Sequence, residues 1–346
     1  MKRADAIRVL VFLLAAVGVF LLPRFLSDFR AQQIAYVGIY FIALLGLNLL
    51  TGITGQISLG HGAFMLIGGY TTAILISDQG LKLGGHTFSS DMKDIWTIPL
   101  AGLVAGIAGF LFGFPALRLT GLYLALATFA IAVAMPGLIK YDRFETFTGG
   151  GGGINLFGIP GLTGALEGVT IPVIDRTITF NEWLYYLSWT VALFLFVVAW
   201  ALLRGKIGRS FRAIRDSELA AASSGVNLAT YKTLAFGISA FYAGVAGSLL
   251  AIATTFVNPD AFGITLSIFL LVGVVVGGLG SLWPLVFGAI FIQFLPLWAQ
   301  EVSKAQGAPA VVYGVILILV MILLPGGAAG LIRRLQALSR GYNRGR

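Results

Sequence analysis

The chain has 346 residues, of which 58% are hydrophobic and only 11% are charged, and its formal net charge is +9. Soluble domains are about 45–50% apolar and roughly 25% charged, so this composition indicates a protein whose outer surface lies mostly in lipid. Because there is no cysteine, disulfides, thiolate catalysis and cysteine-bound metals are excluded. The two histidines, His61 and His86, cannot form a multi-histidine zinc site.

Apolar runs without Asp, Glu, Lys or Arg recur along the whole chain. A transmembrane helix takes about 20 mostly apolar residues. The candidate runs are 9–22, 31–50, 62–77, 95–117, 119–139, 183–203, 233–257, 261–279, 282–300 and 308–332. We therefore expect an all-α polytopic membrane protein with about ten transmembrane or partly re-entrant helices, of which the first is an uncleaved anchor.

The second and third runs are separated by the polar, glycine-rich stretch 51–62. Its glycines make a regular helix costly, by roughly 1 kcal/mol for each interior glycine relative to alanine, and Gln56, Ser58 and His61 can satisfy the freed backbone groups. Broken backbone at membrane depth is tolerated only where it is buried in protein or lines a wet cavity. Two interpretations stay open: a short inner loop packed on its own protein, or a re-entrant element that lines a pathway. A catalytic role for His61 is disfavoured, because no acid lies near it in the sequence.

Farther along, the long polar segment 140–182 contains five consecutive glycines at 149–153. Such a run is flexible, and we expect it either to be a simple linker or to become ordered only against a partner or a substrate. The spacings Gly102-x-x-x-Gly106, Gly109-x-x-x-Gly113 and Gly273-x-x-x-Gly277 fit close helix crossing. They arise easily by chance in a chain with 46 glycines, so they identify no partner surface.

The segment 204–232 is predicted to form two short helices. Apolar Ile207, Phe211 and Ile214 fall on the face opposite Arg209, Arg212 and Arg215, as in a helix that lies on a membrane surface. For the second helix, Asp216 or Ser217 is a suitable N-cap, Glu218 suits the positive end of the helix dipole, and Gly225 suits the C-cap. So short a helix needs something to dock against. The segment is either a solvated connector or a docking element for a cytoplasmic motor subunit.

Charge placement predicts the orientation. If the N-terminus lies inside, the inner segments hold 15 of the 23 Lys and Arg residues but only three of the 14 acids. This excess of inner bases agrees with the positive-inside rule. Both termini are therefore expected in the cytoplasm, and the basic residues face lipid headgroups rather than nucleic acid.

The sequence contains no recognisable binding site for a coupling ion or for ATP. The apolar runs contain no ionisable group of the kind that coupled carriers use. The Gly205-Lys206 pair is followed by Ile207 and lacks the first glycine of a phosphate-binding loop. We expect a transport subunit that is not an enzyme, has no cofactor of its own, and is driven by other subunits.

Four stretches resemble the permease subunits of branched-chain amino acid ABC importers, the LivH/LivM family, and within it the LivM type. They are GITGQISLGHGAF at 52–64, GLYLALAT at 121–128, TGGGGGI at 148–154 and GRSFRAIRDSELAA at 208–221. The chain departs from the family at 324–328, where Leu-Pro-Gly-Gly-Ala replaces the usual Arg-Pro-x-Gly-Leu.

The resemblance implies an ABC importer permease in the bacterial cytoplasmic (inner) membrane. It further implies a homologous LivH-type permease partner, two cytoplasmic ATPases that use ATP and Mg, and an external solute-binding protein. The substrate pathway is assigned to Gly52, Gly55, Gln56, Ser58, His61, Tyr123 and Thr128. Coupling to the ATPase is assigned to Arg212, Arg215, Asp216, Glu218, Ala221 and Gly225.

On this interpretation the chain is one permease domain, 1–346. Its parts are an anchor (1–33), a first helix group (34–139) broken at 51–62, an external loop (140–182), a coupling segment (204–232), a last helix group (233–332) and a basic tail (333–346). Two alternatives stay open: a family member that carries urea, short amides or other amino acids, and a stand-alone channel for a small neutral solute. Co-purification with an ATPase distinguishes the channel from the importer.

Overall fold

The fold is taken from a computed structural model of the chain. The described residues are 18–19, 22–25, 27–76, 81–83, 86–88, 94–116, 119, 121–157, 170–171, 176–177, 179–302, 308–323, 326–332 and 334. Most of the expected anchor 1–33, much of the expected external loop 140–182 and nearly all of the tail 333–346 lie outside these residues.

Helices make up most of the described chain, and each apolar run from 31–50 onward corresponds to one of them. They are α2 (Asp28–Leu47), α3 (His61–Ile76), α4 (Asp94–Ala116), α5 (Leu122–Ile139), α7 (Phe180–Arg204), α10 (Leu228–Thr254), α11 (Ile264–Gly277), α12 (Leu285–Val302) and α13 (Ala308–Leu323). Among the described residues, six helices are long and apolar enough to cross a membrane, and α3 and α12 are shorter apolar helices. The chain is thus an all-α multi-pass bundle, while the total of about ten spans stays a prediction.

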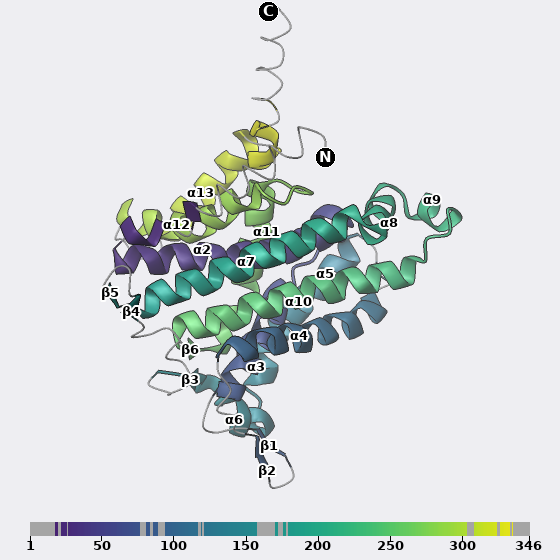
Figure 1. The fold of residues 1–346 in the computed structure, drawn as a ribbon. Coiled ribbons are helices and arrows are strands. Elements are labelled where there is room, and N and C mark those ends of the chain that lie inside the picture. Colours follow the sequence, from purple (N-terminus) through teal and green to yellow (C-terminus); the bar gives the residue numbers. More distant parts are fainter. Residues whose placement is uncertain are drawn as a thin grey trace, which may run out of the picture.

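Two helices, α2 and α10, form the centre of the bundle. In α2 and α10, 78% and 83% of the most apolar 18-residue stretch is buried, whereas in α5 and α7 the share is 28%. Helix α10 packs against α4, α3 and α2, and α2 packs against α7. Figure 1 shows α2, α7, α10 and α4 running side by side, with α12 and α13 on the far side of α2.

Close packing around α10 depends on glycines. Helix α4 turns four of them toward α10: Gly102, Gly106, Gly109 and Gly113. A Cβ atom built on Gly109 would lie only 2.2 Å from the Cβ of Ala240. On the α3 side, a Cβ atom on Gly247 would lie 1.9 Å from the Met65 carbonyl oxygen. Small residues allow such close approach of helices, and van der Waals packing then stabilises the pair.

Short elements mark the two ends of the bundle. At one end lie α8 (Lys206–Asp216) and α9 (Glu218–Ser223), between the end of α7 and the start of α10 (Figure 1). At the other end, which we call the β6 end, β6 (Phe256–Val257) follows α10 and pairs with β3 (Ile154–Asn155). The remaining short elements are η1 (Leu22–Phe25), β1 (Leu81–Leu83), β2 (His86–Phe88), α6 (Asp142–Thr148), η3 (Gly150–Gly152), β4 (Thr170–Ile171), β5 (Arg176–Thr177) and η4 (Pro259–Phe262).

The five-glycine run differs from the expectation that it would order only against a partner or substrate. Gly149, Gly150 and Gly153 adopt positive φ angles of 68°, 54° and 70°. A Cβ atom on Gly153 would lie 2.3 Å from the Val257 carbonyl oxygen. The run is therefore ordered against β6 of its own chain, because glycine permits both the turns and the close backbone approach.

Candidate functional site

The end of α2 does not stop as an α-helix but widens into one π-helical stretch, η2 (Asn48–Ile53). The Thr54 amide donates to the Leu49 carbonyl at 3.3 Å, the Gln56 amide donates to the Leu50 carbonyl at 3.1 Å, and the Thr54 hydroxyl also donates to the Leu50 carbonyl. Wide turns of this kind occur frequently at functional sites.

Asn48 connects this helix end to the turn between α11 and α12. Its side-chain amide donates to the Ser281 carbonyl at 3.0 Å and accepts from the Gly280 amide at 2.8 Å. Asn48 is fully buried, whereas its partners in the turn are only part-buried. The sequence interpretation missed this residue. The signal was available, because Asn48 is an amide inside an otherwise apolar run.

Residues 54–60 have no regular helix and run through part of the bundle. Just before this segment, the Gly52 carbonyl accepts a hydrogen bond from Arg215 of α8. Just after it, the Gly62 amide donates to the Ser267 hydroxyl of α11 at 2.9 Å. Burial alternates along the segment, with 54, 56, 58 and 60 buried and 55 and 57 exposed. The segment is not a strand, because Thr54 lies in the right-handed helical region and Gly55 has φ 76°, but its alternation leaves one edge open.

The alternation places the predicted pathway residues on different sides. Gln56, Ser58 and His61 are 8%, 1% and 1% exposed, whereas Ile57 is 47% exposed. Gln56 and Ser58 satisfy local partners: Gln56 Nε2 donates to the Thr54 hydroxyl, and Ser58 Oγ accepts from the Gly60 amide, both at 3.3 Å. The open edge of the segment is formed by Gly55 and Ile57. The sequence interpretation did not select Ile57, because an isoleucine in an apolar chain gives no signal of its own.

His61 is the first residue of α3 and lies inside the bundle. Within the part of the chain that the structure describes, its Nε2 atom has no hydrogen-bond partner, and no group of three His, Asp or Glu residues could hold a metal ion. A general base needs its acceptor within reach of a substrate proton. The burial of His61 does not provide that access.

Helix α5 supports the non-helical segment 54–60 from the side. The Thr128 hydroxyl accepts from the Leu59 amide at 2.9 Å and donates to the Ala125 carbonyl at 3.0 Å. Tyr123, the other predicted pathway residue of this helix, is 71% exposed. It belongs to an exposed apolar stripe that contains Tyr123, Leu126, Phe129 and Val133.

The segment 204–232 folds as two helices, as its pattern predicts. Ser217 caps α9 by accepting from the Ala220 amide at 3.3 Å, and Gly225 has φ 82°. The apolar face of α8 does not lie on a membrane surface as expected. Phe211 is fully buried and stands edge-on to Tyr231 of α10, with ring centroids 6.4 Å apart. The helix therefore packs on protein, with its arginines exposed.

The predicted coupling residues hold α8 and α9 in place. The Arg212 guanidinium donates to the Leu203 carbonyl at 3.2 Å, and the carboxylate of Glu218 pairs with buried Lys232 at 2.7 Å. Ala221 is buried and Asp216 is exposed. The sequence interpretation missed Leu219, an apolar side chain on α9 that is 85% exposed.

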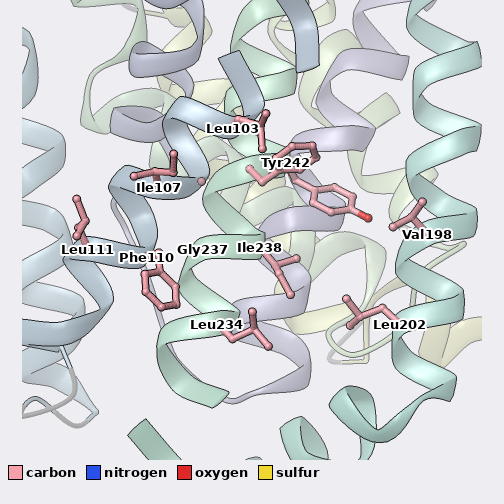
Figure 2. A pocket seen from close by; sticks show the side chains of 12 residues that line it. Leu103, Ile107, Phe110, Leu111, Val198, Leu202, Leu234, Gly237, Ile238 and Tyr242 are labelled. Carbon is pink, nitrogen blue, oxygen red and sulfur yellow. The ribbon is translucent and has the colours of Figure 1, made fainter. Parts of the chain in front are cut away.

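A separate groove of about 460 Å³ lies between α4, α7 and α10 (Figure 2). Its walls are aliphatic and aromatic, and the Tyr242 hydroxyl donates to the Leu195 carbonyl at 2.8 Å. None of the predicted pathway residues lines it. Because a polar solute needs a few placed polar groups, this groove suits hydrocarbon better than an amino acid with charged ends.

Comparison with known proteins places these features in a family. The family model described as branched-chain amino acid transport system / permease component matches residues 30–324. The high-affinity branched-chain amino acid transport system permease protein LivM of Salmonella typhimurium is 35% identical, over 89% of this chain and 71% of its own length. The probable LivM of Methanocaldococcus jannaschii is 23% identical, over 87% and 93%. The LivH permease protein of Salmonella typhimurium is 23% identical, over 84% and 91%. No solved structure shows significant similarity.

Proposed function

Because the chain belongs to the family of branched-chain amino acid transport permease components, we propose that its bundle forms one half of the pathway of an ATP-driven importer. It is a membrane permease subunit for branched-chain amino acids, not an enzyme.

The non-helical segment 54–60 carries the proposal. Unwound backbone is tolerated at membrane depth only where it is buried or lines a cavity, and this segment has one buried edge and one open edge, formed by Gly55 and Ile57. Beyond the open edge, the Leu59 amide joins the segment to Thr128 of α5. An aliphatic side chain on that edge, flanked by backbone polar groups, suits an amino acid with an aliphatic side chain and charged ends.

The apolar stripe of α5 is the proposed contact with the second permease. A contiguous exposed apolar face marks an interaction or lipid surface, and the broken segment lies against this same helix. The similarity to LivH supports a partner built on the same plan as this chain. The substrate would then pass between the two subunits, and Tyr123 would lie at their junction.

The end that carries α8 and α9 is the proposed cytoplasmic end. It holds Arg204, Lys206, Arg209, Arg212 and Arg215, in agreement with the positive-inside rule. Both termini would lie on this side, in the bacterial inner membrane. Leu219 would enter a groove of one of two ATPase subunits, which bind the ATP and Mg, while the β6 end receives the external solute-binding protein.

A pair of adjacent cysteine variants tests the pathway in this naturally cysteine-free chain. Ile57→Cys is expected to react with an aqueous thiol reagent and to lose leucine uptake on modification. Ser58→Cys, whose parent side chain is 1% exposed, is the matched control and is expected not to react. Failure of Ile57→Cys to react in both nucleotide-free and ATP-bound transporter would overturn the pathway assignment.

The docking assignment has its own test. Leu219→Asp places a charge on the exposed apolar contact and is expected to abolish co-purification of the ATPase subunits. Leu219→Met keeps an apolar side chain of similar volume and is expected to preserve it. Equal recovery of the ATPases with both variants would remove Leu219 from the interface.

A further inference from the structure

Arg215, at the end of α8, reaches out of its own segment to the broken end of α2. Its Nη1 atom donates to the Gly52 carbonyl at 2.6 Å. Two further glycines lie against the same side chain. A Cβ atom built on Gly55 would lie 3.3 Å from Arg215 Cγ, and one on Gly280 would lie 3.0 Å from Nη1. One arginine is therefore in close contact with three glycines from two distant parts of the chain.

The electrostatics of this contact follow from the helix end. The last carbonyls of a helix have no partner within it, and they form the negative pole of the helix dipole. Gly52 lies in the last turn of η2, so the guanidinium satisfies one such carbonyl with a charge-assisted hydrogen bond. Gly55 and Gly280 have φ angles of 76° and 78°, which shape the backbone around the arginine.

The same helix end is attached to a third element. Asn48 binds the backbone of Gly280 and Ser281, in the turn between α11 and α12. Thus α8, the end of α2 and this turn are joined through Arg215 and Asn48. The preceding arginine of α8 behaves differently, because Arg212 donates to the Leu203 carbonyl of helix α7.

We propose that Arg215 is the positioning residue that transmits movement of the α8–α9 segment to the pathway. This proposal rests on the proposed function, in which α9 docks on the ATPase and 54–60 lines the pathway. When α8 moves, the short bond to Gly52 and the contact with Gly55 move the start of the segment 54–60 with it. Ile57, on the exposed edge two residues beyond Gly55, then changes its position in the pathway.

The first test separates ATP hydrolysis from uptake in the assembled transporter. Arg215→Gln is expected to lower leucine uptake by about tenfold, because a hydrogen bond to a charged group contributes roughly that factor or more. ATP hydrolysis is expected to stay within about twofold of wild type, because the substitution leaves the docking helix α9 unchanged. A twofold change corresponds to about 0.4 kcal/mol. The number of ATP molecules consumed per leucine therefore rises. Arg209→Gln, an exposed arginine on the same helix, is the matched control and should leave that ratio unchanged.

The second test replaces the contact between Gly55 and Arg215 by a covalent bond. A Cβ atom on Gly55 would lie 3.7 Å from the Cβ of Arg215, and disulfides have a Cβ–Cβ distance near 3.8 Å. Because Gly55 has φ 76°, a cysteine there is strained, so each variant is compared with itself in the oxidised and the reduced form. In the double variant Gly55→Cys/Arg215→Cys, oxidation is expected to restore uptake severalfold over the reduced protein. The single variants, which cannot form the bond, are expected to show no such recovery.

The outcomes distinguish this proposal from the one on which it rests. If wild-type transporter shows no ATP-dependent leucine uptake, the proposed function fails. If wild type transports and Arg215→Gln keeps the normal ratio of ATP to leucine, only the role of Arg215 fails. A disulfide that forms without restoring uptake would also overturn transmission through this contact.

Discussion

The glycines of α4 and the glycines at the end of α2 all lack a side chain, but this has a different structural consequence in each place. In α4 they stay within a helix, and what matters is volume: a Cβ atom on Gly109 would meet Ala240 at 2.2 Å. At the end of α2 the backbone itself changes direction. Gly55 has φ 76°, and a Cβ atom on Gly52 would lie 2.0 Å from Asn48 Oδ1. The first set lets two helices pack closely, and the second lets the backbone leave the helix.

The largest effect is expected where volume is added between α4 and α10. Gly109→Leu forces the two helices apart, and overpacking of this kind costs about 1–3 kcal/mol or more. The amount of folded protein extracted from membranes, measured by size-exclusion chromatography, should fall strongly. Gly137→Leu on α5 is the control, because nothing lies within 4 Å of a Cβ atom there. Equal losses in both variants would contradict the packing role of the α4 glycines.

At the end of α2, transport is expected to fail before folding does. A Cβ atom on Gly52 would lie 2.0 Å from Asn48 Oδ1 and 2.6 Å from the Gly280 amide nitrogen, so Gly52→Ala displaces both the Asn48 amide and the turn after α11 and weakens the bonds of Asn48 to Gly280 and Ser281. We expect leucine uptake to fall by about tenfold, as for the loss of roughly 1.4 kcal/mol of interaction, while the folded amount stays near wild type. Uptake and folded amount should therefore separate for Gly52→Ala and fall together for Gly109→Leu. A parallel loss of folded Gly52→Ala protein would remove the distinction between the two glycine sets.

A smaller effect is expected at Thr128, which joins the non-helical segment 54–60 to α5. Thr128→Val keeps the shape but leaves the Leu59 amide without its acceptor, at a cost of about 1–3 kcal/mol for a buried group and less where it is part-exposed. The apparent melting temperature of detergent-solubilised protein should fall. Thr128→Ser retains the hydroxyl and should melt close to wild type. A lower melting temperature for the serine variant than for the valine variant would show that the methyl group, not the hydrogen bond, is important.

Sequence patterns were most informative where hydrophobicity alone decides the outcome. The apolar run 183–203 lies within α7, and 95–117 nearly coincides with α4, because the length and polarity of a span are local properties. The break after α2 was also predictable, since glycine is costly in a helix. Which edge of 54–60 is open was not, because that depends on how α5 and α11 pack around it.

The position of α8 shows the same limit. Its amphipathic pattern is correct, but the pattern does not distinguish a lipid surface from a protein one, and Phe211 packs against Tyr231. Asn48 and Leu219 were missed for a related reason. Asn48 is a polar residue in an apolar run, but its partners, Gly280 and Ser281, lie far away in the chain. Leu219 is ordinary in its local sequence, and only its 85% exposure on the folded chain distinguishes it.

The smallest expected effect concerns a glycine of neither set. Gly314 lies in the middle of α13, and nothing lies within 4 Å of a Cβ atom built on it. Gly314→Ala should raise the free energy of unfolding by about 0.5–1 kcal/mol, because alanine loses less backbone entropy in a helix. A slight rise in the apparent melting temperature, with unchanged uptake, would confirm that glycine is needed only where a neighbour or a positive φ requires it. If Gly314→Ala instead lowers the melting temperature, Gly314 has a close neighbour in another subunit of the assembled transporter. Glycine would then also serve the packing of α13 against that subunit.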